Sequence, residues 1–157
     1  MIKRACIYDV GFLDAVVRIP DILEDTADDI QKEKISGYSH IGKLMDTNNY
    51  IFIFINENIS IGFISFFPIN STTYDSHISI IAKYRGSAAL NNTKEAIKWM
   101  FCNTKCMKIL GAIPEFNKKA IVYAKKVGYS NEAIIKRSFV KGGKLISRII
   151  LSIEKEV

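Results

Sequence analysis

The chain has 157 residues, of which 48% are hydrophobic and 24% are charged. This is the composition of an ordinary globular domain, and it excludes a disordered tail and a disulfide-rich scaffold. No apolar run approaches the roughly 18 residues that a membrane span requires, and the basic start meets Asp9 before the apolar region of a signal peptide can form. We therefore expect one domain, residues 1–157, of a soluble cytoplasmic protein that does not bind membranes.

The three cysteines, Cys6, Cys102 and Cys106, include no CxxC pair. An odd number without that spacing predicts neither a disulfide framework nor a zinc ribbon. Since His40 and His77 are the two histidines, no metal site is predicted. We expect reduced cysteines that are buried or half-buried and have a structural role.

The net charge of +6 is unevenly distributed along the chain. Residues 1–80 hold 6 Lys and Arg against 11 Asp and Glu, a net charge of −5, whereas residues 81–157 hold 16 against 5, a net charge of +11. The basic second half favours an anionic partner, either nucleic acid or a phosphorylated cofactor. Composition alone leaves both open.

The first half of the chain predicts a strand, helices and a hairpin. Residues 3–8 are apolar and predict a short strand, after which apolar residues follow at helical spacing up to Ile30. Pro20 interrupts that segment and predicts two helical pieces. Residues 50–55 and 59–67 are rich in aromatic and β-branched residues on either side of Asn56-Glu57-Asn58, so they predict a hairpin.

The second half predicts a strand, a turn and a helix, then a second strand and helix, and a final hairpin. Residues 76–82 form the first strand, and helical periodicity follows the turn as far as Phe101. Residues 108–113 form the next strand, after which Asn117 is placed to cap a helix that Gly128 ends. Residues 133–140 and 145–153 flank a Lys-Gly-Gly-Lys turn. This order predicts an α/β or α+β sheet with helices on its faces.

The turn Arg85-Gly86-Ser87-Ala88-Ala89 connects a strand to a helix through small residues. The first amides of such a helix are unpaired and lie at the positive end of its dipole, so an anion docks there on the main chain. Arg85 adds a charge-assisted donor. The plainer interpretation is simple packing of small residues, and the GxxxxGK[ST] pattern of a Walker A loop is absent.

The segment from Ile113 to Tyr129 carries a more specific pattern. After Asn117 the chain has Ala three residues on, Tyr six on, Lys nine on, Gly eleven on and then an aromatic residue. Together with the Tyr84-Arg85-Gly86 turn upstream, this order and spacing resembles motifs A and B of the GCN5-related N-acetyltransferase (GNAT) superfamily. The resemblance covers residues 50–153, and Trp99, His77 and Ile113-Pro114 are similar to small variants of bacteriophage type.

The resemblance implies a GNAT-like α/β (α+β) fold, with a central mixed, mostly antiparallel sheet flanked by helices. It places acetyl-CoA, as the acetyl donor, where strands 4 and 5 splay apart. In the family a backbone amide near the end of strand 4 polarises the thioester carbonyl, and the next turn holds the pyrophosphate. The positions that match these two roles are Ile80, Ile81 and Ala82 for the amide, and Arg85, Gly86, Ser87, Ala88, Ala89 and Leu90 for the turn.

Two positions depart from the family's turn, Arg/Gln-x-x-Gly-x-Gly/Ala. Ala88 is a mild departure, whereas Leu90 is expected to limit close backbone approach and to weaken acetyl-CoA binding. Lys125 and Lys126 are the candidates to meet the 3′-phosphate, and Asn117 is a candidate polar contact of the cofactor.

Amine acetylation requires a neutral amine, stabilisation of an oxyanion and a proton for the departing thiolate. Tyr123 matches the family's thiolate-facing tyrosine and is the predicted general acid, because a phenol with a pKa near 10 suits a thiol leaving group. His77 is the predicted general base, and Glu115 competes for that role. The plainer interpretation is that Tyr123 only packs, Asn117 only caps and His77 is structural.

We expect an N-acetyltransferase that moves acetyl from acetyl-CoA to an amine by direct attack in a ternary complex. Small amines, amino acids, proteins and charged tRNA all remain possible acceptors. The alternative is a non-catalytic module of the same fold whose basic second half binds nucleic acid or another acidic partner, although an aromatic and basic stripe of the RNP type is absent. The C-terminal hairpin edge leaves a homodimer open.

Overall fold

The computed structural model describes residues 1–156, apart from the side chain of Ser36. Its strands and α-helices are, in chain order, β1 (Ile2–Arg4), α1 (Val10–Val17), α2 (Pro20–Thr26), α3 (Asp29–Lys34), α4 (Ile41–Met45), β2 (Tyr50–Asn56), β3 (Ile59–Pro68), β4 (Thr73–Ile80), α5 (Ser87–Asn103), β5 (Lys108–Pro114), α6 (Lys118–Val127), β6 (Ser130–Lys141) and β7 (Lys144–Glu154). Three short 3-10 helices are η1 (Ile7–Asp9), η2 (Ile35–Gly37) and η3 (Ala82–Tyr84).

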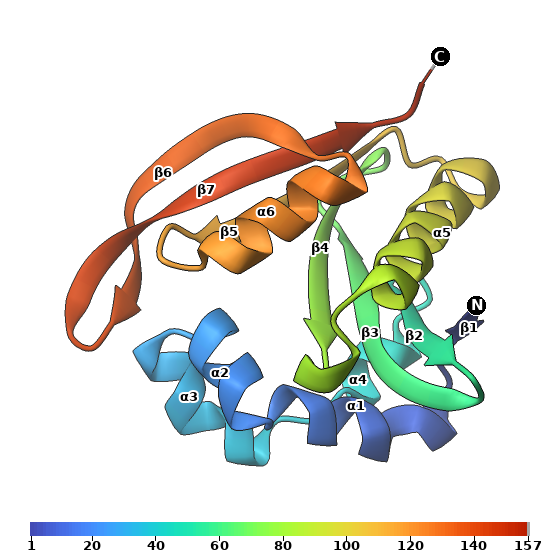
Figure 1. Ribbon diagram of the computed structural model, residues 1–157, viewed down its shortest axis with the longest axis horizontal. Coiled ribbons are helices and arrows are strands. Elements are labelled where there is room, and N and C mark those ends of the chain that lie inside the picture. Colours follow the sequence, from blue (N-terminus) through green and yellow to red (C-terminus); the bar gives the residue numbers. More distant parts are fainter. Residues whose placement is uncertain (157) are drawn as a thin grey trace.

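The seven strands form one sheet in the order β1-β2-β3-β4-β5-β7-β6 (Figure 1). Every neighbouring pair is antiparallel except β4 and β5, which run parallel. The chain reaches β5 through α5, since a parallel neighbour requires a crossover. This is the mixed, mostly antiparallel sheet with flanking helices that the family resemblance implied.

Helices cover both faces of the sheet, and β2 shows how. Phe52 and Phe54 point to a core that they share with α5 and α6, whereas Ile51 and Ile53 point to a second core with α1 and α2. Alternate residues of a strand face opposite sides, so an uninterrupted apolar strand is what a sheet covered on both faces requires. The acidic N-terminal helices therefore lie on the face opposite α5 and α6.

Both predicted hairpins are confirmed. Glu57 and Asn58 have φ angles of 49° and 65°, and Gly142 and Gly143 have φ angles of 55° and 72°. Two consecutive residues with positive φ make the tight turn that matches the twist of a two-stranded ribbon. The Asn117 cap and the Gly128 end of α6 are also confirmed, since the Asn117 side chain accepts a hydrogen bond from the Ala120 amide.

The predictions for the N-terminal segment were partly wrong. The predicted strand over residues 3–8 stops at Arg4, because the Asp9 carboxylate accepts a hydrogen bond from the Cys6 amide at 2.9 Å and turns the chain into η1. The acidic segment forms three helices instead of two. Asp28 and Gln31 cap α3 reciprocally and begin a new helix that apolar spacing alone does not reveal.

Candidate active site

The strands β4 and β5 pair over a short length and then diverge. Their hydrogen-bonded register covers Thr73–Asp75 against Lys108–Leu110. Beyond it, β4 continues beside β3 as far as Ile80, and β5 continues beside β7 as far as Pro114. The sheet therefore opens between residues 76–80 and residues 111–114, at the end of β4 that leads into α5.

Main-chain groups of both strands that bond to no neighbouring strand face this opening. The Ile81 amide donates to the Ile61 carbonyl, so in the β3–β4 register the odd-numbered residues of β4 bond to β3. The amides and carbonyls of Ile78 and Ile80 consequently point the other way, toward the opening. The same argument on β5, where the Glu115 amide donates to the Ser147 carbonyl, turns those of Ala112 toward it.

Two side chains join the strands at the point of divergence. The Ser76 hydroxyl donates to the Leu110 carbonyl at 2.7 Å and lies 3.1 Å from the hydroxyl of Tyr129. Because Ser76 has one proton, it accepts from Tyr129. Burial raises the pKa of Tyr129 far above its ordinary value, so Tyr129 stays a neutral donor. This buried pair marks where the opening begins.

The turn after β4 ends in the free amides of α5. Gly86 precedes the helix without a side-chain cap, and no acidic residue occupies the first turn. The Ser87, Ala88 and Ala89 amides therefore have no partner within the helix. The Arg85 side chain folds back so that its Nε donates to the Ile80 carbonyl at 3.2 Å, and the rest of its guanidinium remains available. The structure thus brings together the strand end and the turn that the sequence singled out.

The three predicted amide positions at the end of β4 differ in availability. Ile80 turns its amide toward the opening, Ile81 uses its amide in the bond to β3, and Ala82 begins η3. Leu90, the main departure from the family's turn, already donates its amide to the Gly86 carbonyl within the first helical turn. Its side chain packs against the main core together with that of Ala88.

Tyr123 connects α6 to α5. Its hydroxyl lies 2.7 Å from the Thr93 hydroxyl, and Thr93 in turn lies 3.0 Å from the Ala89 carbonyl. The single Thr93 proton satisfies either Ala89 or Tyr123. When Thr93 donates its proton to the Ala89 carbonyl, the Tyr123 hydroxyl donates to Thr93. When Thr93 donates instead to Tyr123, the phenol proton of Tyr123 is free for another acceptor. Burial raises the pKa of Tyr123, which the Thr93 hydrogen bond partly offsets, so Tyr123 is protonated at neutral pH.

His77 lies on β4 with its side chain 60% exposed. Its Nε2 lies 3.0 Å from the Asp75 carboxylate, two residues earlier on the same face of the strand. A neutral imidazole that donates from Nε2 presents its unprotonated Nδ1 to solvent. The arrangement is that of a carboxylate-oriented imidazole able to accept a proton.

Glu115 and Asn117 have other partners near the end of β5. The Glu115 carboxylate accepts from the Ser147 amide at 3.1 Å, which ties it to β7. The Asn117 side chain caps α6 through its oxygen and donates from Nδ2 to the Asp25 carbonyl at 3.1 Å, which ties α6 to α2. Their predicted roles as base and cofactor contact stay predictions. Lys125 and Lys126 are exposed on the last turn of α6.

The rest of the described chain adds little to the site. Over residues 1–156 no cluster of three or more metal-ligating side chains occurs, and no helix combines the length and apolarity needed to cross a membrane. All three cysteines are free, but Cys6 and Cys102 are exposed, so the prediction of burial holds for Cys106 alone. Two surface pockets of about 480 and 430 Å³ lie elsewhere, beside Tyr74 and beside Trp99.

Sequence reasoning missed the partners of two predicted residues, Asp75 for His77 and Thr93 for Tyr123, and the contact of Ser76 with Tyr129 at the start of the opening. The sequence marks Asp75, like Tyr74, only as a residue that could attract a cationic acceptor. Its pairing with His77 was detectable, because strand residues two apart share a face. Thr93 and Tyr129 were not, since they meet Tyr123 and Ser76 only through tertiary packing at sequence separations of 30 and 53 residues.

Three solved structures that are similar to this chain are acetyltransferases. Spermidine N-acetyltransferase from Vibrio cholerae, solved in complex with CoA and spermine, superposes with a TM-score of 0.79 at 15% identity over 98% of this chain and 94% of that chain. A ribosomal-protein-alanine N-acetyltransferase from Brucella melitensis has a TM-score of 0.76 at 15% identity over 99% of both chains. A GNAT-family acetyltransferase from Bacillus anthracis has a TM-score of 0.76 at 19% identity over 98% and 93%.

No protein-family model and no curated protein matches the sequence itself. The agreement with the solved structures extends over almost the whole chain despite the low identity. The chain therefore has the fold of the GCN5-related N-acetyltransferases.

Proposed function

We propose that this protein transfers the acetyl group of acetyl-CoA to an amine by direct attack within a ternary complex. The observation that carries the proposal is the opening between β4 and β5, lined by free main-chain groups and continuous with the uncapped start of α5. Acetyl-CoA supplies an activated acetyl thioester on a long arm with amide groups, followed by a pyrophosphate. Unpaired strand amides suit the arm, and a helix start beside Arg85 suits the pyrophosphate.

Residues at the end of β4, in the turn after it and on α6 would bind acetyl-CoA. The Ile80 amide points into the opening and is the donor for the acyl oxygen. Ser87, Ala88 and Ala89 present their amides, and Arg85 its guanidinium, to the pyrophosphate. Lys126, on the last turn of α6, is the partner for the 3′-phosphate.

Two side chains would move protons. His77, held by Asp75, accepts the proton of the attacking amine at Nδ1. Tyr123 donates a proton to the departing thiolate when the Thr93 hydroxyl turns from Ala89 toward it. A protonated phenol is available because burial raises the pKa of Tyr123.

Calorimetric titration of the full chain with acetyl-CoA tests the binding step. We expect saturable binding, and we expect Arg85→Ala to weaken it at least about tenfold because a charge-assisted hydrogen bond contributes about 1.5–3 kcal/mol. Lys94→Ala, which removes an exposed lysine from the middle of α5, is the control and should bind like the parent. Binding that Arg85→Ala leaves unchanged would contradict the placement at the turn.

Initial-velocity kinetics with an amine panel test the transfer step. The panel includes spermine and a peptide that presents an alanine amine, after the acceptors named for the similar structures. Direct attack predicts intersecting double-reciprocal lines, and parallel lines would indicate an acetylated enzyme instead. Failure to bind acetyl-CoA, together with salt-dependent RNA binding, would favour the non-catalytic module whose basic second half holds nucleic acid.

A further inference from the structure

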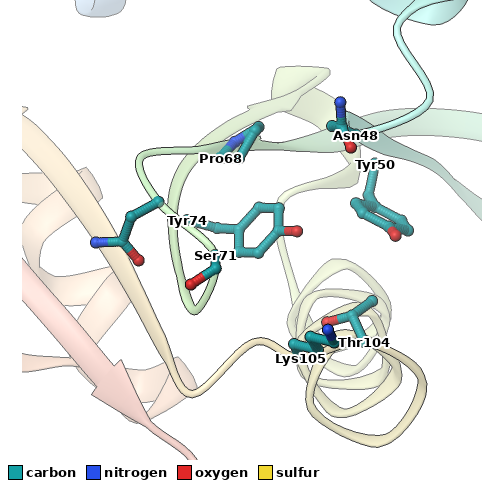
Figure 2. A pocket seen from close by; sticks show the side chains of 8 residues that line it. Asn48, Tyr50, Pro68, Ser71, Tyr74, Thr104 and Lys105 are labelled. Carbon is teal, nitrogen blue, oxygen red and sulfur yellow. The ribbon is translucent and has the colours of Figure 1, made fainter.

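A separate pocket lies at the end of β4 where β4 and β5 are still paired. The β3–β4 turn, the segment before β2 and the segment after α5 line an open surface pocket of about 480 Å³ (Figure 2). Tyr50, Tyr74, Asn70, Ser71 and Lys105 are among the residues that line it, and we call it the closed-end pocket. The opening between β4 and β5 begins beyond it, at Ser76, so the two sites are distinct.

Tyr74 is the unusual residue of the closed-end pocket. It is only 8% exposed, yet its hydroxyl has no hydrogen-bond partner among the described residues. Buried tyrosine hydroxyls ordinarily have one. Within the described chain no side-chain polar atom is both fully enclosed and unpaired, so the hydroxyl must open onto the pocket. Figure 2 shows the Tyr74 ring lying across the pocket with its hydroxyl directed to the Tyr50 side.

The lining of the pocket includes one cationic side chain, Lys105, while the Asp46 carboxylate accepts from the amide of the lining residue Asn48 at 2.9 Å. Its lining contains no Asp or Glu, and the exposed Lys105 makes no ion pair or hydrogen bond within residues 1–156. The Arg4 guanidinium lies 4.2 Å from the centre of the Tyr50 ring and donates to the Asn49 carbonyl at 2.6 Å. A cation against one face of Tyr50 makes its phenol a stronger hydrogen-bond donor. The Tyr50 and Tyr74 rings lie 5.9 Å apart, edge to face.

The end of α5 opposes this charge only in part. A helix C-terminus carries partial negative charge on its unpaired carbonyls. Side chains at this end bond to carbonyls one turn further back, since Asn103 donates to the Trp99 carbonyl at 2.9 Å and the Thr104 hydroxyl donates at 2.6 Å to the Met100 carbonyl, which also accepts from the Thr104 amide. The Lys105 ammonium follows directly after them in the chain.

From these contacts we propose that the closed-end pocket binds a small oxyanion, a carboxylate or a phosphate monoester, through the Tyr74 hydroxyl and the Lys105 ammonium. A phenol and an ammonium are both donors, and charge-assisted bonds to an oxyanion are the strongest that they make. The proposal is independent of acetyl-CoA binding, because no residue of the closed-end pocket belongs to the opening between β4 and β5.

Fluorine NMR of the full chain labelled with 3-fluorotyrosine tests the proposal. The Tyr74 resonance is assigned by its loss in Tyr74→Phe, and the protein is titrated with acetate, with inorganic phosphate and with sodium chloride at matched ionic strength. We expect a saturable shift of the Tyr74 resonance with acetate or with phosphate. The anion that produces this shift tells whether the pocket binds carboxylates or phosphate monoesters. Chloride should produce no saturable shift.

Two variants make the outcome decisive. Lys105→Ala removes an exposed side chain, so we expect the fold to be retained. We expect this substitution to lower the affinity for the anion at least fivefold. Lys94→Ala removes an exposed lysine of α5 outside the pocket and should leave the affinity unchanged. A shift that never saturates with either anion, or a saturable shift that Lys105→Ala leaves unaltered, would overturn the proposal whether or not acetyl-CoA binds.

Discussion

At the scale of single residues, the hydrogen bond between Tyr123 and Thr93 lets structural and catalytic roles be separated. Tyr123→Phe leaves Thr93 bonded to Ala89, so we expect it to lower the free energy of unfolding by about 1 kcal/mol. Thr93→Val leaves the Tyr123 hydroxyl without its partner, and the double variant should cost less than the sum of the two. Urea unfolding of the four proteins measures this coupling.

The same variants distinguish a proton donor from a packing residue. As the general acid, Tyr123 should be needed for turnover, so Tyr123→Phe should lower kcat by about 10²–10⁴ and leave acetyl-CoA affinity intact. Thr93→Val keeps the phenol proton and should retain most of the activity. Tyr8→Phe, at a side chain that is 94% exposed, is the matched control. Equal losses of kcat in Tyr123→Phe and Thr93→Val would point to packing alone.

At the scale of elements, the β6–β7 hairpin is fastened to the N-terminal helices at its tip (Figure 1). The Asp29 carboxylate accepts from the Gly143 amide at 2.8 Å and from the Gly142 amide at 3.0 Å. Glu24 bonds both Lys141 of the hairpin and Lys32 of α3. Elements that are distant in sequence are thus held together, and Asn117 at the start of α6 makes a further contact with α2.

Asp29→Ala should release this tip. We expect amide hydrogen exchange at Gly142 and Gly143 to become faster, with little change elsewhere in the sheet. The two amide bonds, that of Gly143 first, hold the pKa of Asp29 below its ordinary value. The contact is therefore complete above the unfolded pKa near 3.9 and is lost as the pH falls through the lower folded value. Asp21→Ala is the control. Unchanged amide exchange at Gly142 and Gly143 in Asp29→Ala would show that Asp29 does not hold the hairpin tip.

At the scale of the whole molecule, a buried histidine makes folding sensitive to acid. His40 is 4% exposed, and Asp14 of α1 accepts from both its Nδ1, at 2.7 Å, and its amide, at 2.8 Å. Burial lowers the pKa of His40 despite the opposing Asp14 carboxylate, and the charges of Arg18 and Lys43 act in the same direction as burial. His40 is therefore neutral in the folded protein while the unfolded chain protonates near pH 6.5.

Stability should consequently fall as the pH drops below about 6.5, because the unfolded state takes up the proton first. One proton corresponds to a slope of up to about 1.4 kcal/mol per pH unit until the folded pKa is reached. Urea unfolding between pH 7.5 and about pH 5 should show this slope in the parent and in His77→Gln, whose histidine is exposed, and should lose it in His40→Gln. An unaltered slope in His40→Gln would assign the pH dependence to another group.

Local signals in the sequence determined much of the fold of this protein. The Asn and Gly residues of the two hairpin turns, the Asn117 cap and the Gly128 end act over a few residues, so their effect can be read from spacing. The strand, turn and helix around Arg85 are likewise local, and they placed the candidate anion site. The N-terminal helices were less readable, because a cap such as Asp28 competes with apolar periodicity over the same few residues.

Only the tertiary structure decided the strand order of the sheet and the contacts between residues that are far apart in the chain. The sequence predicts the strands β4 and β5, but the order in which β7 lies between β5 and β6, the point where β4 and β5 separate, and the contact of Ser76 with Tyr129 appear only in the folded chain. The partner of Tyr123 and the open hydroxyl of Tyr74 arise in the same way, from packing between segments far apart in the chain. Spacing along the chain specifies which face a residue occupies, whereas long-range packing specifies what that residue meets there.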